Sequence, residues 1–384
     1  MDLTLNSALY GAKPSAIREF SRLAAQTPGC VRLTLGEPDF GTPASVRAAA
    51  CEALDAGETH YIENSGALAL REKIAAFEAA RNGLDYGPQE VIVTIGATEA
   101  LFAALFGVLN PGDEVIVPTP AFVLYERIIG LCRGVYVPLD TAPDGFQLRA
   151  DRLNALITPR TKAIVLNSPN NPTGCVYTRA SLEVVREAVR DKPIFVICDD
   201  VYRQLCFTED YHSFAEYRDM RERIIAVQSF SKPYAMTGWR MGYLMADEPV
   251  ARRLALLHQF MVTSSPAPFQ RACMAALEHD PADMTSTYRR RRDDVVNRLR
   301  AMGLPLVTPE GAFYAFPSIK KFHMDSTAFC TRLLKEAGVA VTPGAAFGAD
   351  GHIRISFCCG DEALMEGLDR LAGFVGRLEG GADT

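Results

Sequence analysis

The chain has 384 residues, of which 48% are hydrophobic and 22% are charged, as in an ordinary soluble globular protein. Its 40 lysines and arginines against 46 aspartates and glutamates give a formal net charge of −6, and no long basic run suggests a nucleic-acid or membrane-surface partner. One basic cluster, 288–294 (YRRRRDD), lies in a stretch of helical periodicity and is interpreted as a solvated helix face.

Export and metal binding are not indicated. Residues 1–20 lack a basic region followed by an apolar core and a cleavage site, and the longest apolar run, 100–109, is too short to span a bilayer. The ten cysteines form no CxxC pair and the six histidines no HExxH pattern. We therefore expect a cytoplasmic protein with reduced cysteines and no catalytic metal.

Short β-branched runs alternate with amphipathic stretches from about residue 89 to residue 246, which is typical of repeated βαβ units. Strands are predicted within 91–95, 110–118, 162–167, 194–199, 224–228 and 243–246. Because these strands are apolar on both faces, the pattern predicts an α/β fold whose mostly parallel central sheet is sandwiched by helices.

The C-terminal part has a different pattern. It reads as a helix, a strand within 311–319, a helix over 326–338, a strand over 352–357 and a closing helix, which predicts a smaller α+β domain. We expect residues 1–45 to join this small domain, 46–285 to form the large domain and 286–384 to form the small one.

Ligands of open parallel sheets bind at the carboxyl ends of the strands, where four loops carry polar residues. Gly96 opens a loop that could cradle a phosphate or be an ordinary turn. The loop 168–174 (SPNNPTG) offers amide side chains or is a plain connection. Asp199 and Tyr202 are candidate site residues. Alternatively, Asp199 caps the next helix and Tyr202 belongs to the core.

Lys232 follows the last of these strands and has three explanations. It is a surface lysine, the lysine of a Ser-x-x-Lys acyl-transfer site with Ser229, or a Schiff-base lysine. The acyl-transfer site needs S-D-N and K-T-G companions, which the sequence lacks. A Schiff-base lysine needs a phosphate anchor and partners for a pyridine nitrogen and a phenolic oxygen, and the other loops offer all three.

Over nearly its whole length the sequence resembles the pyridoxal-phosphate enzymes of fold type I, the class I/II aminotransferases. The resemblance rests on LTLGEPDFGTP (33–43), THYIENSGALALRE (59–72), GATEAL (96–101), PTPAFVLY (118–125), NSPNNPTG (167–174), DDVY (199–202), SFSKPYAMTGWRMGY (229–243), GAFYAFPS (311–318) and HIRISF (352–357). In its sequence details the chain is most similar to a subgroup called aminotransferase A, to which N-acetyl-diaminopimelate transamination is attributed.

The resemblance implies a role for each residue around the cofactor ring. Lys232 forms the aldimine with pyridoxal 5'-phosphate and, once displaced, moves the proton at the substrate α-carbon. Asp199 keeps the pyridine nitrogen protonated. Tyr202 and Asn171 donate to the phenolic oxygen, and Phe122 stacks on the ring.

The phosphate and the subunit interface are implied in the same way. Ala97 and Thr98 supply a helix N-terminus, Ser229 a hydroxyl and Arg240 a bidentate charge for the phosphate. Tyr61 matches a residue that reaches the phosphate of the neighbouring subunit. A homodimer with shared active sites is therefore expected.

The substrate is expected to be an L-amino acid held at its α-carboxylate by Arg354, with Asn171 and the backbone at Gly36 beside it. A surface arginine and a simple turn are the alternatives for Arg354 and Gly36. The expected reaction is transamination in two half-reactions with a 2-oxo acid, 2-oxoglutarate first. The aromatic pocket residues Phe122 and Tyr125 favour a broad or aromatic-leaning specificity.

Two other functions compete with transamination. A C–S β-lyase on the same scaffold would release pyruvate and ammonia without an acceptor. A cofactor-sensing transcription regulator would need an added DNA-binding segment, and the family match, which begins by residue 33, leaves no room for one.

Overall fold

The computed structural model describes residues 4–10 and 16–380. Its largest sheet has the strand order β2, β8, β7, β6, β5, β3, β4. These strands are β2 (Val91–Thr94), β3 (Glu114–Thr119), β4 (Val135–Asp140), β5 (Thr161–Asn167), β6 (Phe195–Asp199), β7 (Ile224–Ser229) and β8 (Gly242–Ala246). Only β8 runs antiparallel to its neighbours, so the predicted mostly parallel sheet is confirmed.

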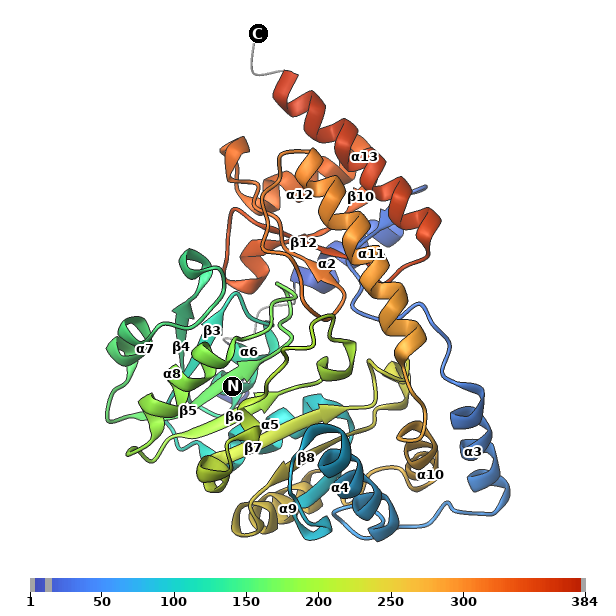
Figure 1. Ribbon diagram of the computed structural model, residues 1–384, viewed down its shortest axis with the longest axis vertical. Coiled ribbons are helices and arrows are strands. Elements are labelled where there is room, and N and C mark those ends of the chain that lie inside the picture. The colour runs from blue at the N-terminus through green and yellow to red at the C-terminus, as the bar shows by residue number, and fades with distance from the viewer. Residues whose placement is uncertain (1–3, 11–15, 381–384) are drawn as a thin grey trace.

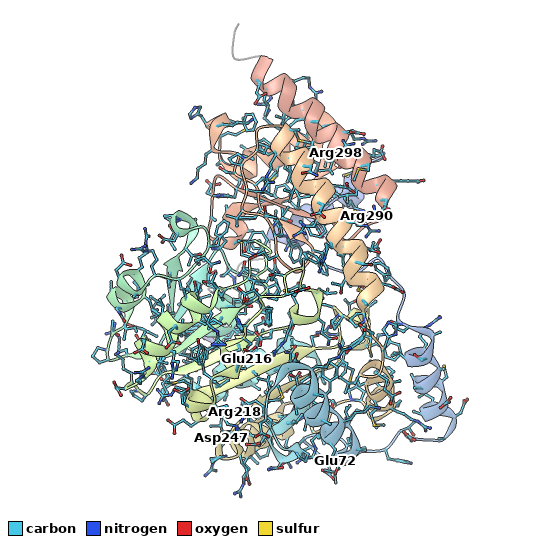
Figure 2. All side chains as sticks on the ribbon, in the orientation of Figure 1. Glu72, Glu216, Arg218, Asp247, Arg290 and Arg298 are labelled. Atoms are coloured by element: carbon cyan, nitrogen blue, oxygen red, sulfur yellow. The ribbon has the colours of Figure 1, made fainter. Side chains whose placement is uncertain are left out.

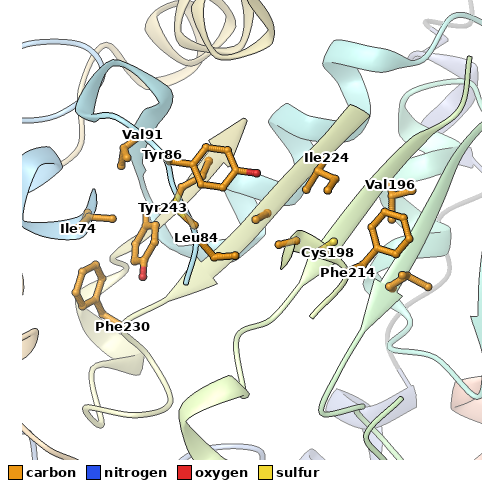
Figure 3. Packing of buried hydrophobic residues seen from close by; sticks show 14 of the residues in the cluster. Ile74, Leu84, Tyr86, Val91, Val196, Cys198, Phe214, Ile224, Phe230 and Tyr243 are labelled. Carbon is orange, nitrogen blue, oxygen red and sulfur yellow. The ribbon is translucent and has the colours of Figure 1, made fainter. Parts of the chain in front are cut away.

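Alternate side chains of each strand enter two different cores. In β6, Val196 and Cys198 belong to one buried cluster and Ile197 to the other. Helices α4 (Leu68–Asn82), α7 (Ala150–Leu156), α8 (Arg179–Val189) and α10 (Ala267–Ala276) cover the first face, and α5 (Gly96–Val108), α6 (Leu124–Leu131) and α9 (Glu248–Val262) cover the second. Figure 3 shows the packing of the first cluster.

The edge strand β4 was not predicted. It lies at the edge of the sheet, and its side chains are mostly half-buried or exposed. Its sequence, VYVPLD, contains a proline, which is tolerated in an edge strand but argues against a central strand. Its neighbour β3 is buried along its entire length.

A second group of elements lies at the top of the molecule in Figure 1. It comprises α2 (Ala16–Gln26), β1 (Val31–Arg32), α11 (Ala282–Ala301), β9 (Tyr314–Ala315), α12 (Ser326–Ala337), β10 (Val339–Ala340), β11 (Thr342–Pro343), β12 (Ile353–Ser356) and α13 (Asp361–Gly380). Strand β1 pairs with β10, and β12 lies between β11 and β9. The first pairing joins residues 31–32 to the C-terminal part of the chain, and the boundaries 1–45, 46–285 and 286–384 stay predictions.

The remaining elements are short or peripheral. Helix α3 (Ala44–Asp55) packs against α10, and α1 spans Ser7–Tyr10. Short 3₁₀ helices lie at Pro88–Glu90, Ala142–Asp144, Arg203–Leu205, Phe214–Glu216, Arg218–Arg223, Thr237–Trp239, Lys320–Phe322 and Gly344–Phe347.

The interpretation of the basic cluster as a solvated face is wrong for Arg291. Its guanidinium is buried and forms ion pairs with Asp39 at 2.9 Å and with Asp361 at 2.7 Å. The helical period places Arg291 on the inward face of α11, one turn beyond the buried Tyr288. Arg290 is exposed beside it and Arg298 lies further along the helix (Figure 2). Arg291 thus ties α11 to both the N-terminal segment and α13.

Within residues 4–10 and 16–380, none of the helices combines the length and apolarity needed to cross a bilayer. The same residues contain no group of three acidic, histidine or cysteine side chains placed to hold a metal ion.

Candidate active site

A cavity of about 440 Å³ lies where the carboxyl ends of the central strands face the small domain. Eleven residues predicted from the sequence line it: Gly36, Ala97, Thr98, Phe122, Asn171, Asp199, Tyr202, Ser229, Lys232, Arg240 and Arg354. Leu35, Leu101, Leu124, Tyr125, Asn167, Val201, Ser231, Thr237 and Tyr314 complete the lining. The structure therefore brings segments from residue 35 to residue 354 to one place.

One end of the cavity is built for an anion. Strand β2 passes into α5 through Gly96, whose φ of +69° is a conformation that glycine adopts without strain. A Cβ on Gly96 would lie 2.6 Å from a terminal nitrogen of Arg240, so the guanidinium sits directly against the turn. The start of α5, Arg240 and the Ser229 hydroxyl together make a cradle suited to a phosphate.

A buried pair behind this turn was missed in the sequence analysis. The backbone N–H of Ile95 donates to Glu99 Oε2 over 2.7 Å, and Glu99 Oε1 lies 2.8 Å from Nδ1 of His258 on α9. Glu99 and His258 are both buried. The pair fixes the turn before α5, but its members are 159 positions apart, so no local pattern revealed it.

Asp199 ends β6 at the floor of the cavity. Its Oδ2 accepts a hydrogen bond of 2.5 Å from the Tyr125 hydroxyl, and Asn167 Nδ2 donates to its backbone carbonyl over 2.9 Å. Its Oδ1 is buried and has no hydrogen-bond partner of good geometry among the described residues. Burial raises the pKa of this carboxyl to about 6, against the opposing effects of the Tyr125 hydroxyl, the Val201 N–H and Lys232.

Lys232 enters the cavity from the loop after β7. Its Nζ donates to the carbonyl of Gly36 over 2.5 Å and lies 5.8 Å and 5.7 Å from the ring centroids of Tyr202 and Phe313. Desolvation by these surroundings lowers the pKa of the ammonium to about 8. At pH 7 about a tenth of the side chain is therefore the free amine that a nucleophile or base requires, far more than for a lysine of ordinary pKa.

Arg354 projects from β12 on the opposite wall. It donates to Asn171 Oδ1 over 2.9 Å and to the carbonyl of Thr34 over 2.7 Å. Its Nε is buried and unpartnered within the described part of the chain. The guanidinium lies 4.5 Å from the ring centroid of Tyr314, whose hydroxyl is 2.9 Å from that of Tyr202. These contacts hold the planar group in a fixed orientation that suits a carboxylate ligand.

Tyr61 is the one predicted site residue that does not line the cavity. Its side chain is 87% exposed. Its proposed contact with a neighbouring subunit stays a prediction, because the structure contains a single chain.

Residues 28–371 match the model of the family described as aminotransferase class I and II. The chain belongs to this family. An aspartate aminotransferase of Thermotoga maritima is 40% identical to this chain over 346 residues, which cover 90% of this chain and 91% of the relative. A probable N-acetyl-LL-diaminopimelate aminotransferase of Bacillus subtilis is 40% identical over 381 residues, 98% of this chain and 96% of the relative.

Solved structures agree with the family assignment. The aspartate aminotransferase of Thermus thermophilus with maleate superposes with a TM-score of 0.92 at 37% identity, covering 97% of this chain and 99% of that one. An aromatic aminotransferase of Pyrococcus horikoshii gives 0.89 at 38% identity, covering 94% and 99%. The enzyme therefore has the fold type I architecture expected from the sequence.

The cofactor of the enzyme is pyridoxal 5'-phosphate, and the cavity fits it. The cradle at Gly96 and Arg240 provides cationic and backbone donors for a phosphate. Oδ1 of Asp199, which has no hydrogen-bond partner of good geometry among the described residues, is an acceptor for a protonated ring nitrogen. Lys232 is an amine of lowered pKa for the aldehyde.

Proposed function

We propose that the enzyme transfers the amino group of an L-amino acid to a 2-oxo acid, with 2-oxoglutarate as the first acceptor to test, in two half-reactions. The observation that carries this proposal is the shared cavity of Lys232, Asp199 and Arg354. An amine of lowered pKa, an unpartnered buried carboxylate oxygen and an oriented guanidinium face one space.

Pyridoxal phosphate, when bound, supplies an aldehyde that condenses with amines and a ring that accepts electrons. Asp199 accepts a hydrogen bond from the ring nitrogen, and its negative charge favours the protonated ring. Tyr202 and Asn171 hold the phenolic oxygen, while Ala97, Thr98, Ser229 and Arg240 hold the phosphate.

The substrate is held and activated by the chain itself. Arg354 binds the α-carboxylate through its planar fork, beside the backbone of Gly36. Lys232 Nζ would then take the proton from the substrate α-carbon and deliver it to the aldehyde carbon of the cofactor within the same half-reaction. In the second half-reaction, with the 2-oxo acid, it would move a proton in the opposite direction. Because the pKa of Lys232 is about 8, the fraction of free amine, and with it the rate, is expected to rise between pH 7 and pH 9.

We further propose donors with uncharged, preferably aromatic side chains. Among the described residues that line the cavity, the cations are Lys232, Arg240 and Arg354, and each has a role in the proposal above. The other lining includes Leu35, Leu124, Phe122 and Tyr125. The competing donors are those in the names of relatives: aspartate, which carries a distal carboxylate, and N-acetyl-LL-diaminopimelate, which is larger than the common amino acids.

A homodimer and a cytoplasmic location complete the proposal. The apolar side chains of Leu54, Tyr61 and Leu68 are 51%, 87% and 47% exposed, and exposed apolar side chains of this kind suit contact with a second copy. All ten cysteines are unpaired, in keeping with a reducing compartment. Sedimentation equilibrium of the holoenzyme tests the dimer.

The decisive experiment titrates the holoenzyme with single amino acids in the absence of acceptor. A donor is expected to convert the cofactor stoichiometrically, as followed by its absorbance, and 2-oxoglutarate is expected to restore the original spectrum. Lys232→Ala should abolish both changes and the covalent attachment of the cofactor. Continuous release of pyruvate and ammonia without acceptor would instead establish a β-lyase, and wild-type turnover by Lys232→Ala would refute the assignment of Lys232.

A further inference from the structure

We propose that Tyr125 is a positioning residue that orients Asp199 toward the ring nitrogen of the cofactor and keeps this carboxylate ionised. The inference rests on the proposed function, because it assigns a task to the neighbour of Asp199. From the sequence alone, Tyr125 is expected only to be an aromatic residue of the substrate pocket.

The geometry around Asp199 carries the proposal. The Tyr125 hydroxyl donates to Oδ2 over 2.5 Å, and both side chains are buried. Because this bond occupies Oδ2 and leaves Oδ1 without a partner of good geometry, the second oxygen stays available to a ligand in the cavity. One hydroxyl therefore selects which carboxylate oxygen meets the ring nitrogen.

The charge of Asp199 depends on the same contact. A buried carboxylate loses its hydration, and a hydrogen bond to the ionised form offsets that loss. No ion pair within 4 Å is present for Asp199 among the described residues, and Lys232 acts on it only from a distance. The tyrosine hydroxyl is the largest of the interactions that favour the carboxylate.

Tyr125 is itself held in place from two sides. It is the second residue of α6, with its ring 6.2 Å from that of Phe122 in an edge-to-face arrangement. Phe122 is the residue proposed to stack on the cofactor ring. Tyr125 thus contacts both Phe122, which is proposed to stack on the ring face, and Asp199, which is proposed to meet the ring nitrogen.

The chain offers a matched control in Tyr243. Its hydroxyl donates to Glu78 Oε1 over 2.6 Å, and both residues are buried, as are Tyr125 and Asp199. Tyr243 belongs to the core shown in Figure 3 and does not line the cavity. Tyr243→Phe therefore removes the same kind of bond without touching the site.

The test reconstitutes wild type, Tyr125→Phe and Tyr243→Phe with cofactor labelled with ¹⁵N at the ring nitrogen and follows its chemical shift against pH. We expect Tyr125→Phe to lose the ring proton at a lower pH than wild type. Its kcat should fall about tenfold or more, as for loss of a hydrogen bond to a charged group, with little change in KM. Tyr243→Phe should match wild type in shift and kcat while losing thermal stability.

Three results would overturn the inference. The first is a Tyr125→Phe titration identical to that of wild type, with a loss of stability alone. The second is a raised KM with an unchanged titration, which would make Tyr125 a substrate contact. The third is an unprotonated ring in the wild type, and only this result would also refute the proposed role of Asp199. If Tyr125→Phe fails to bind cofactor, 3-fluorotyrosine at position 125, which keeps the hydroxyl, should restore binding and the wild-type titration, and its failure to do so would count against the proposal.

Discussion

Arg354 and Asn171 lie 183 positions apart in the sequence, yet a guanidinium nitrogen of one donates to Oδ1 of the other over 2.9 Å. The bond connects β12 of the small domain with the loop after β5 of the large one. The residue proposed to bind the α-carboxylate is thereby coupled to a residue proposed to touch the cofactor. A substitution of either Arg354 or Asn171 should therefore alter the binding of both the substrate carboxylate and the cofactor.

Arg354→Lys is expected to lower kcat/KM for the amino acid by about a hundredfold, chiefly through KM, because an ammonium cannot replace a planar, bidentate donor. Steady-state kinetics and cofactor affinity should be measured together. Arg186→Lys is the control, since Arg186 pairs with Glu183 and Asp219 away from the cavity. An unchanged KM in Arg354→Lys would argue against carboxylate binding at this position.

Much of the fold followed from local patterns. The buried strands β3, β5, β6, β7 and β8 carry runs of apolar residues, so their predicted positions agree with the structure to within a few residues. The edge strand β4 (VYVPLD) was not predicted although it is also rich in apolar residues, and the proline within it is typical of an edge strand or of a segment outside a sheet. The two-residue strands β1, β10 and β11 are shorter than any period that a sequence can display.

Many residues of the candidate site could be predicted from the sequence, but most of the contacts between them could not. Lys232 and Asp199 stand next to predicted strand ends and could be located from position and family motif. The contacts that give them their chemistry could not, because Tyr125 meets Asp199 across 74 positions and Lys232 meets Gly36 across 196. The inward turn of Arg291 depended likewise on an acid, Asp39, from a distant segment.

Gly96→Ala is expected to weaken cofactor binding as well as folding. Alanine at a φ of +69° costs about 1 kcal/mol of stability, and its Cβ would displace the Arg240 guanidinium. Gly83→Ala is the matched control, because Gly83 has a φ of +65° and nothing within 4 Å of the added Cβ. Thermal unfolding should report similar losses for the two apoenzymes, and cofactor titration should show a loss of affinity only for Gly96→Ala. Equal affinities would remove Arg240 from the phosphate cradle.

Gly36→Ala should slow the reaction without straining the backbone. The added Cβ would lie 2.3 Å from the Tyr314 hydroxyl, so this hydroxyl would have to move. The movement would break its present contact with the Tyr202 hydroxyl, from which it lies 2.9 Å. A shift in the cofactor absorbance and a reduced kcat are expected, since Tyr202 is proposed to hold the phenolic oxygen. Gly41→Ala, with nothing within 4 Å, should behave as wild type. A normal spectrum in Gly36→Ala would show that the Tyr202–Tyr314 contact has no influence on the cofactor.

Asp199→Asn should make the apoenzyme more stable at pH 7 while disabling the holoenzyme. The pKa of Asp199 in the folded state is about 6, above its ordinary value of 3.8, so between these pH values the folded state retains a proton that the unfolded state has lost. The free energy of unfolding of wild type therefore falls, relative to Asp199→Asn, as pH rises from about 4 to about 6, by roughly 3 kcal/mol. Urea unfolding of both apoproteins across this range measures the difference.

The control for this linkage has the opposite sign. Arg186 lowers the pKa of Asp219, so that carboxylate stabilises the fold above its unfolded pKa and ceases to do so as pH falls through the folded value. Asp219→Asn should accordingly be less stable than wild type at pH 7, with the difference shrinking in acid. Parallel stability curves for wild type and Asp199→Asn would mean that Asp199 is ionised in the folded apoenzyme at no cost, and the argument that Tyr125 is needed to keep it charged would lose its physical basis.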